Sequence, residues 1–301
     1  MNAREDWLAA RRKGIGGSDA AAALGQSRYK SSYELWAEKT GALADEKPDT
    51  ERMLFGRVME SVIANLYAER HGVRVRRRNA IIHHPKYHFM LANVDRVIEG
   101  VRVGLECKNV DSLAYRFGEW GEPGSDQVPT EYLLQCAHYM FVLDYPEWHL
   151  AACIGGNHLA TYVIHRDREL DEMVVDGESA FWNRVESGQP PGFDFEQRNA
   201  VELLRRLHPG TSGGTIALDA DVDHWHAVRL EADQQVGMYQ AVSDGARAHI
   251  LHAMGNAAVG TLPHGGEYKR KTVHRRAYTV DETDYVTLTY SKPKEAREVS
   301  P

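Results

Sequence analysis

Hydrophobic residues change their spacing several times along the chain, and this succession constrains the fold more than any other feature. Over residues 50–72 they recur at the spacing of a helix that ends on a glycine. Residues 73–108 contain three short strand-like segments, which we interpret as one antiparallel unit. A helix over 131–145, two strands within 148–165 and a helix over 167–188 follow. This order of elements predicts a mixed α/β domain.

Turn-forming residues divide the chain into two regions. The α/β domain is expected to span 1–190, to open with two short helices around the loop GIGGSD, and to end at the segment GQPPG. Its loop over 111–130 is longer than most connections, which favours a lid or a substrate loop. The region 195–301 is expected to contain one long amphipathic helix over 223–254 and then a β-hairpin with a basic side.

Composition excludes several classes of protein. No run of about 18 uncharged apolar residues exists, and no apolar run follows the charges of the first residues, so we expect neither a membrane span nor a secretory signal. Cys107, Cys136 and Cys153 are far apart and form no CxxC pair, which argues against a zinc ribbon, an iron–sulfur cluster or a disulfide scaffold. We therefore expect a protein of the reducing cytoplasm with no membrane partner.

The net charge of -7 means that nucleic-acid binding cannot be inferred from the charge of the whole chain. Cations are concentrated locally, at 11–13, 74–78 and 269–276. Each such cluster is more often a solvated face than a phosphate site. The clusters are therefore supporting evidence only.

Asp95, Glu106 and Lys108 form the pattern with the clearest chemical meaning. Because side chains alternate along a strand, Glu106 and Lys108 share one face, and an aspartate on the preceding strand can reach the same point. Two converging carboxylates repel each other unless a cation lies between them, and their hard oxygen atoms suit magnesium or manganese. When the Glu-x-Lys pair is considered alone, an ordinary solvated strand face explains it better than a metal site does.

Two further polar residues occur among apolar neighbours. Glu60 is on a helical face with small and apolar residues, where a carboxylate is costly without a partner. Gln135 lies within an apolar helix, with Tyr139 one turn later on the same face. A side chain that reaches solvent at the helix boundary would explain Glu60, and a satisfied core amide would explain Gln135.

Several motifs in one order resemble the YqaJ viral recombinase family, relatives of phage lambda exonuclease within the PD-(D/E)xK nuclease superfamily. They are RRKGIGGSDAAAALG, YELWAEKTG, FGRVMESVIANLYAERHG, LANVDRVI, LECKN and QCAHYMFVL. Together they cover about residues 7–160, and YKRKTVHRRAYTV also resembles the end of such proteins. The resemblance implies a restriction-endonuclease-like α/β core, in which helices flank a mixed β-sheet, followed by the long helix and the hairpin.

The resemblance also implies roles at the metal site. Asp95 and Glu106 would bind the metal ions, two Mg²⁺ or Mn²⁺, with the main-chain carbonyl of Cys107 as a further ligand. Glu60 would act through metal-bound water. The superfamily's Pro-Asp is Val94-Asp95 here. Since the proline shapes the strand and supplies no ligand, this departure puts little in doubt.

Other residues would handle water and DNA. Lys108 would position or activate the attacking water, and Gln135 would orient Lys108 or the scissile phosphate. Arg11 or Arg12, together with Ser18, would hold a 5′-phosphate at the glycine-rich loop. The remaining residues that we expect to bind DNA are Tyr139, Lys269, Arg270 and Arg275.

The expected activity is Mg²⁺-dependent hydrolysis of phosphodiesters at the ends of duplex DNA, 5′ to 3′, in phage-type recombination. Two metal ions would polarise the phosphate and generate hydroxide. The expected partners are a single-strand annealing protein and further copies of this chain, because lambda exonuclease relatives form rings. Two alternatives stay open: an endonuclease with the same core, and a DNA-binding protein that has lost catalysis. The retained acids argue against the second.

Overall fold

A computed structural model describes residues 9–43, 50–78, 80–274, 282 and 288. The chain divides into two compact units, Met1–His208 and Pro209–Pro301, which are described separately. None of the described helices has the length and apolarity needed to cross a membrane.

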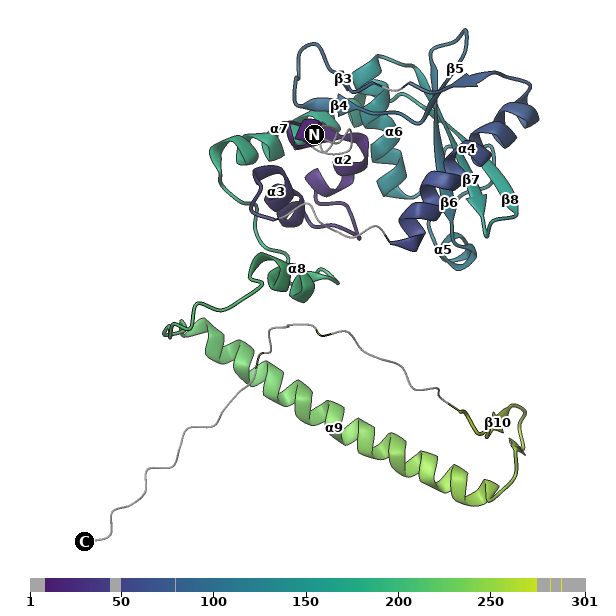
Figure 1. Cartoon of the computed structure of the whole chain (residues 1–301), viewed down its shortest axis with the longest axis vertical. Helices are drawn as coiled ribbons and strands as arrows, with labels where there is room; N and C mark the ends of the chain where they lie inside the picture. The colour runs from purple at the N-terminus through teal and green to yellow at the C-terminus, as the bar shows by residue number, and fades with distance from the viewer. Residues whose placement is uncertain (1–8, 44–49, 79, 275–281, 283–287, 289–301) are drawn as a thin grey trace. The chain divides into compact units, whose positions relative to one another are not determined.

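The first unit contains both helices and strands, in groups along the chain (Figure 1). Its helices are α2 (Gly17–Ala23), α3 (Ser32–Thr40), α4 (Glu51–His71), α5 (Ser112–Arg116), α6 (Thr130–Leu143), α7 (Arg168–Ser187) and α8 (Ala200–Leu207). Its strands are β1 (Ile15–Gly16), β2 (Val75–Arg76), β3 (Ile82–His83), β4 (Met90–Ala92), β5 (Arg96–Ile98), β6 (Val103–Val110), β7 (Glu147–Ile154) and β8 (His158–His165).

A five-stranded mixed sheet with the order β2-β5-β6-β7-β8 forms the centre of this unit. β6 and β7 are parallel, and the other neighbouring strands are antiparallel. Apolar side chains alternate between the two faces of the sheet, which makes a separate core on each. Leu105 packs against α4 on one face, whereas Leu150 belongs to the core that α2, α6 and α7 cover on the other. The expected mixed sheet with flanking helices is confirmed.

The three strand-like segments do not form one antiparallel unit as predicted. β2, β5 and β6 are neighbours in the central sheet, but β3 and β4 form a second sheet with β1. The expected strand around Asp95 is interrupted at residues 93–95, so that its two halves, β4 and β5, join different sheets. Asp95 therefore lies directly before β5, at the junction of the two sheets.

Helix α4 begins and ends as its sequence predicts. The Thr50 side chain accepts a hydrogen bond from the amide of Met53, and Gly72 closes the helix with a φ of 64°, a conformation that favours glycine. Only Ile63, Ala64 and Tyr67 of this helix are buried. One face of α4 thus anchors it to the sheet.

The long loop over 111–130 contains a helix that the sequence did not reveal, α5. Trp120 packs against Tyr115, Tyr132 and Tyr162, with ring centroids 5.2–5.5 Å apart. These aromatic contacts attach the loop to the central sheet and to α6.

The first unit continues past the Gly/Pro-rich segment at which the sequence places its end. Leu203 on α8 is 1% exposed and packs with Ala37 and Leu43. Asn199 and Arg206 hydrogen bond to the fully buried carboxylate of Glu34, at 2.9 and 2.7 Å. These contacts tie residues up to His208 to the first unit.

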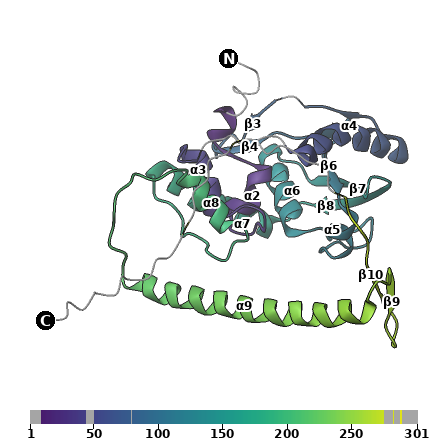
Figure 2. The ribbon, with the colours of Figure 1, turned by 60° about the horizontal axis from the view of Figure 1, so that its bottom comes forward.

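The second unit contains α9 (Asp221–Met254), β9 (Val259–Thr261) and β10 (Glu267–Lys269). β9 and β10 form an antiparallel hairpin directly after the helix (Figure 2). No described residue of α9 is buried within the chain. The predicted long helix and hairpin are both present, and most residues after His274 lie outside the described part of the chain.

Candidate active site

Strand β6 positions two of the predicted site residues. Glu106 and Lys108 point toward α6, whereas Leu105 and Cys107 belong to the core beneath α4. The spacing of two residues produces this arrangement because strand side chains alternate. β6 is paired on both sides, with β5 and β7, so that its side chains have a fixed position.

Glu106 is 3% exposed. Its Oε1 accepts a hydrogen bond from Gln135 Nε2 at 2.7 Å and lies 2.7 Å from Lys108 Nζ. Its Oε2 is buried and has no hydrogen-bond partner among the described residues. A buried carboxylate oxygen without a donor is costly, and a cation would remove that cost.

Asp95 faces the same place from the start of β5. Its Oδ2 accepts a hydrogen bond from the amide of Cys107 at 3.0 Å, which holds the carboxylate beside β6. Burial and the neighbouring Glu106 raise the pKa of Asp95 to about 8. Two carboxylates that disfavour each other's charge, one with an unsatisfied oxygen, fit a divalent cation with oxygen ligands.

Glu60 has a partner that sequence reasoning missed. Its Oε1 accepts a hydrogen bond from the buried guanidinium of Arg96, and Arg77 lies 3.6 Å away. Arg96 also donates to the main-chain oxygen of Asp95 at 2.6 Å. Arg96 thus joins Glu60 to the backbone of Asp95, which answers the question of why a carboxylate occurs on this face. In the sequence, only the position of Arg96 directly after Asp95 points to a place for this arginine near the site.

Lys108 is held by three side chains. Its Nζ contacts Glu106, donates to Gln135 Oε1 at 2.8 Å and lies 5.1 Å from the ring centroid of Tyr132. Burial opposes the charge of Lys108, but the attraction and hydrogen bond of Glu106, together with the attraction of Asp95, outweigh burial and raise the pKa of this lysine above its ordinary value. The raised pKa keeps Lys108 protonated at neutral pH, so that its ammonium group is a cation and a hydrogen-bond donor.

The described residues contain no cluster of three or more His, Cys, Asp or Glu side chains at metal-binding separation. The two carboxylates Asp95 and Glu106 still fit a metal site, since main-chain carbonyls and water supply the other ligands that magnesium prefers. One carboxylate oxygen of Glu60 is already paired with Arg96. This pairing fits a role in which Glu60 contacts a metal ion through water and not directly.

Tyr139 connects this centre with the glycine-rich loop. Its hydroxyl accepts a hydrogen bond from Gln135 Nε2 at 3.3 Å and donates to the main-chain oxygen of Asn93 at 3.1 Å. Its ring lies against Gly17, where an added Cβ would be 2.5 Å from Tyr139 Cε1. Only glycine permits this approach of the loop.

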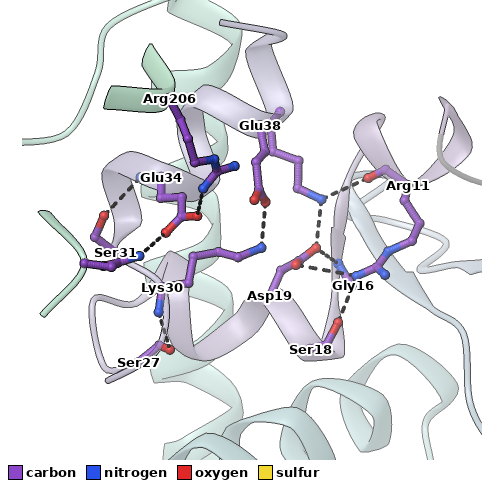
Figure 3. A network of polar contacts seen from close by, with 12 residues as sticks. Arg11, Gly16, Ser18, Asp19, Ser27, Lys30, Ser31, Glu34, Glu38 and Arg206 are labelled. Carbon is purple, nitrogen blue, oxygen red and sulfur yellow. Dashed lines mark hydrogen bonds and ion pairs between the residues drawn. The ribbon is translucent and has the colours of Figure 1, made fainter. Parts of the chain in front are cut away.

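A small cavity of about 50 Å³ lies at the loop, and Arg11, Ser18 and Tyr139 are among its lining residues. Arg11 donates to Ser18 Oγ at 2.8 Å (Figure 3). Arg12 is exposed and does not line this cavity. The geometry therefore distinguishes the two arginines that the sequence left as alternatives, in favour of Arg11.

The predicted basic residues of the hairpin belong to the second unit. Lys269 lies 2.7 Å from Glu267, and Arg270 donates to the main-chain oxygen of Gly255. Both line a cavity of about 590 Å³ between the end of α9 and the hairpin. Arg275 lies outside the described residues.

Comparison with known proteins identifies relatives. Residues 6–146 match the model of the YqaJ-like viral recombinase domain. The chain is 35% identical over 296 residues to protein YqaJ of Bacillus subtilis (strain 168), covering 97% of this chain and 91% of that protein.

Solved structures with a similar arrangement include an alkaline exonuclease and a putative exonuclease. An alkaline exonuclease from Laribacter hongkongensis has 17% identity and a TM-score of 0.46, covering 66% of this chain and 99% of its own. A putative exonuclease from Eubacterium rectale has 12% identity and a TM-score of 0.48, covering 72% of this chain and 96% of its own. The match to the family model and the identity to protein YqaJ show that the chain belongs to the YqaJ-like viral recombinase family.

Proposed function

We propose that this protein is a Mg²⁺-dependent exonuclease that hydrolyses phosphodiesters at the ends of duplex DNA. The observation that carries the proposal is the buried Glu106 carboxylate, whose Oε2 lacks a donor among the described residues while Asp95 faces it. Such a pair suits a hard divalent cation. Family membership supports a role in phage-type recombination.

Asp95 and Glu106 would hold Mg²⁺, or Mn²⁺ in its place, with the main-chain carbonyl of Cys107. Bound there, two such ions would polarise the scissile phosphate and lower the pKa of the attacking water. Lys108 would donate hydrogen bonds to that water or to a phosphate oxygen. Gln135 fixes Lys108 and Glu106 relative to each other by bonding to both. Glu60 would act through a water molecule.

End recognition is the second part of the proposal. The Arg11 guanidinium and the Ser18 hydroxyl line a cavity that Tyr139 also lines, and Tyr139 contacts Gln135. Arginine forms charge-assisted hydrogen bonds with phosphate. A 5′-phosphate held there would place the terminal nucleotide next to the acids, which favours 5′ to 3′ degradation. We further propose that the protein acts as a homo-oligomer beside a single-strand annealing protein.

The test is incubation of the full chain with end-labelled linear duplex and with covalently closed circular DNA, each with Mg²⁺ and with a chelator. We expect mononucleotide release from the 5′ ends of the linear duplex, only with Mg²⁺, and intact circles. Ready cleavage of circles would favour the endonuclease alternative. Binding of DNA without any cleavage would favour a DNA-binding protein that has lost catalysis.

A further inference from the structure

A buried ion pair lies beside the cavity that Arg11 and Ser18 line. Asp19 is in the first turn of α2, and Lys39 is near the end of α3. Their side chains are only 5% and 6% exposed, and Lys39 Nζ lies 2.8 Å from Asp19 Oδ2. Neither residue lines the cavity itself.

The pair contacts both ends of Arg11. Lys39 donates to the main-chain oxygen of Arg11 at 2.9 Å, and Asp19 Oδ1 lies 3.5 Å from the Arg11 guanidinium. The other carboxylate oxygen of Asp19 accepts from the amide of Gly16 at 3.3 Å (Figure 3). The guanidinium nitrogen that faces Asp19 also donates to Ser18. Asp19 and Lys39 thus hold the main chain of Arg11, its guanidinium group and the glycine-rich loop in one arrangement.

Charge alone does not explain a carboxylate at this place. Asp19 repels any anion that approaches Arg11, and a site built only to attract phosphate would omit it. Burial would raise the pKa of Asp19, but Lys39 and Arg11 outweigh burial and hold this pKa well below its ordinary value. Asp19 is therefore charged at neutral pH, and its contribution to an anion site must be geometric.

We propose that Asp19 and Lys39 are positioning residues that hold Arg11 and Ser18 in the arrangement required to select a phosphorylated DNA end. The inference rests on the proposed function for the role of Arg11 and Ser18. It makes a prediction that opposes the electrostatic expectation. Removing the negative charge of Asp19 should weaken recognition of a phosphate, although the site becomes more positive.

The experiment measures fluorescence anisotropy of the full chain with 5′-phosphate and 5′-hydroxyl duplexes, in chelator so that no cleavage occurs. The variants are Asp19→Asn and the double variant Asp19→Asn/Lys39→Gln, which keeps the net charge of the native protein. Glu38→Gln is the matched control, because it removes one negative charge from α3, where Glu38 pairs with Lys30 at 2.6 Å. Urea unfolding establishes that each variant is folded.

We expect the native protein and Glu38→Gln to prefer the phosphorylated end by roughly tenfold, as one charge-assisted contact allows. Both Asp19 variants should lose the preference, with a ratio of about 1. If Asp19→Asn does not fold, the end preference of the double variant tests the proposal. The proposal would be overturned if the folded Asp19 variants kept or increased the ratio of affinities for the 5′-phosphate and the 5′-hydroxyl duplex. Equal binding of both ends by the native protein would also overturn it, and the cleavage test of the proposed function remains independent of this result.

Discussion

One oxygen of the Glu106 carboxylate lies 2.7 Å from the ammonium nitrogen of Lys108, and the other oxygen is buried without a hydrogen-bond donor in the described part of the chain. The lysine therefore satisfies only half of the carboxylate. The unsatisfied half, together with the nearby Asp95, costs free energy in the metal-free protein. The cost predicts effects on stability that can be measured without any substrate.

The first prediction concerns stability without metal. Asp95→Asn should make the metal-free protein about 1–3 kcal/mol more stable near pH 8, because it removes a partly buried negative charge next to Glu106. Added Mg²⁺ should stabilise the native protein and not the variant, by about 2.7 kcal/mol at 100 times the dissociation constant. Urea unfolding with and without Mg²⁺ measures both effects. The exposed Asp126→Asn is the control, and an equal response of both variants to Mg²⁺ would contradict the site.

The second prediction compares the two arginines that contact Glu60. Arg96→Met should cost about 3 kcal/mol of unfolding free energy, because it leaves a partly buried carboxylate without its main partner. Arg77 is 54% exposed and lies 3.6 Å from Glu60, so Arg77→Met should cost under about 1 kcal/mol. Equal losses in urea denaturation would show that Arg96 does not hold Glu60.

Part of this site follows from the sequence alone. Glu106 and Lys108 share a face because strands alternate, and α4 ends at Gly72 because glycine adopts positive φ. Both features depend on residues close together in the chain. Local patterns therefore predicted them correctly.

Other features depend on contacts that no local pattern encodes. Arg96 meets Glu60 across 36 positions, and an arginine at the start of a strand resembles any solvated cation. The division of β4 and β5 between two sheets depends on β1, which pairs with β4 from a distant part of the chain. The choice between Arg11 and Arg12 likewise required the fold of the loop, since both precede it with similar spacing from Ser18.

The third prediction is a loss of stability as the pH rises. His138 and Glu178 are fully buried and 2.8 Å apart, and His138 Nε2 lies 2.8 Å from the main-chain oxygen of Leu91. Burial would lower the pKa of His138, but the charge of Glu178 and the hydrogen bonds to Glu178 and Leu91 together outweigh burial and raise this pKa. Burial raises the pKa of Glu178, against the opposing effect of His138. Both shifts mean that the folded protein binds more protons than the unfolded chain.

The stabilisation from His138 is therefore complete below its unfolded pKa of about 6.5 and is lost as the pH rises through the folded pKa. The unfolding free energy should fall by up to about 1.4 kcal/mol per pH unit for each additional proton that the folded protein binds relative to the unfolded chain. Urea denaturation of metal-free protein between about pH 6 and pH 9 measures this slope. Glu178→Gln should flatten it, and an identical slope in a folded variant would exclude the pair as its source.

The fourth prediction concerns the basic hairpin. Lys269 and Arg270 are proposed to contact the DNA backbone without reading bases. Replacing both with glutamine should weaken binding about equally on all sequences and reduce the log-log salt slope by about one unit per lost phosphate contact. The control replaces Arg205 and Arg229, which are exposed and paired with nearby acids. Unchanged salt slopes in the hairpin variant would show that Lys269 and Arg270 form an ordinary solvated face and do not contact the DNA backbone.

We propose that Asp95, Glu106 and Lys108 form one metal-dependent hydrolytic site. The most direct test measures nucleotide release from linear 5′-phosphate duplex by the native protein and by Glu106→Ala, each with Mg²⁺ and with chelator. We predict release by the native protein only with Mg²⁺, and a rate roughly three decades lower for a folded Glu106→Ala. Release at the native rate by folded Glu106→Ala, or undiminished release in chelator, would contradict the account.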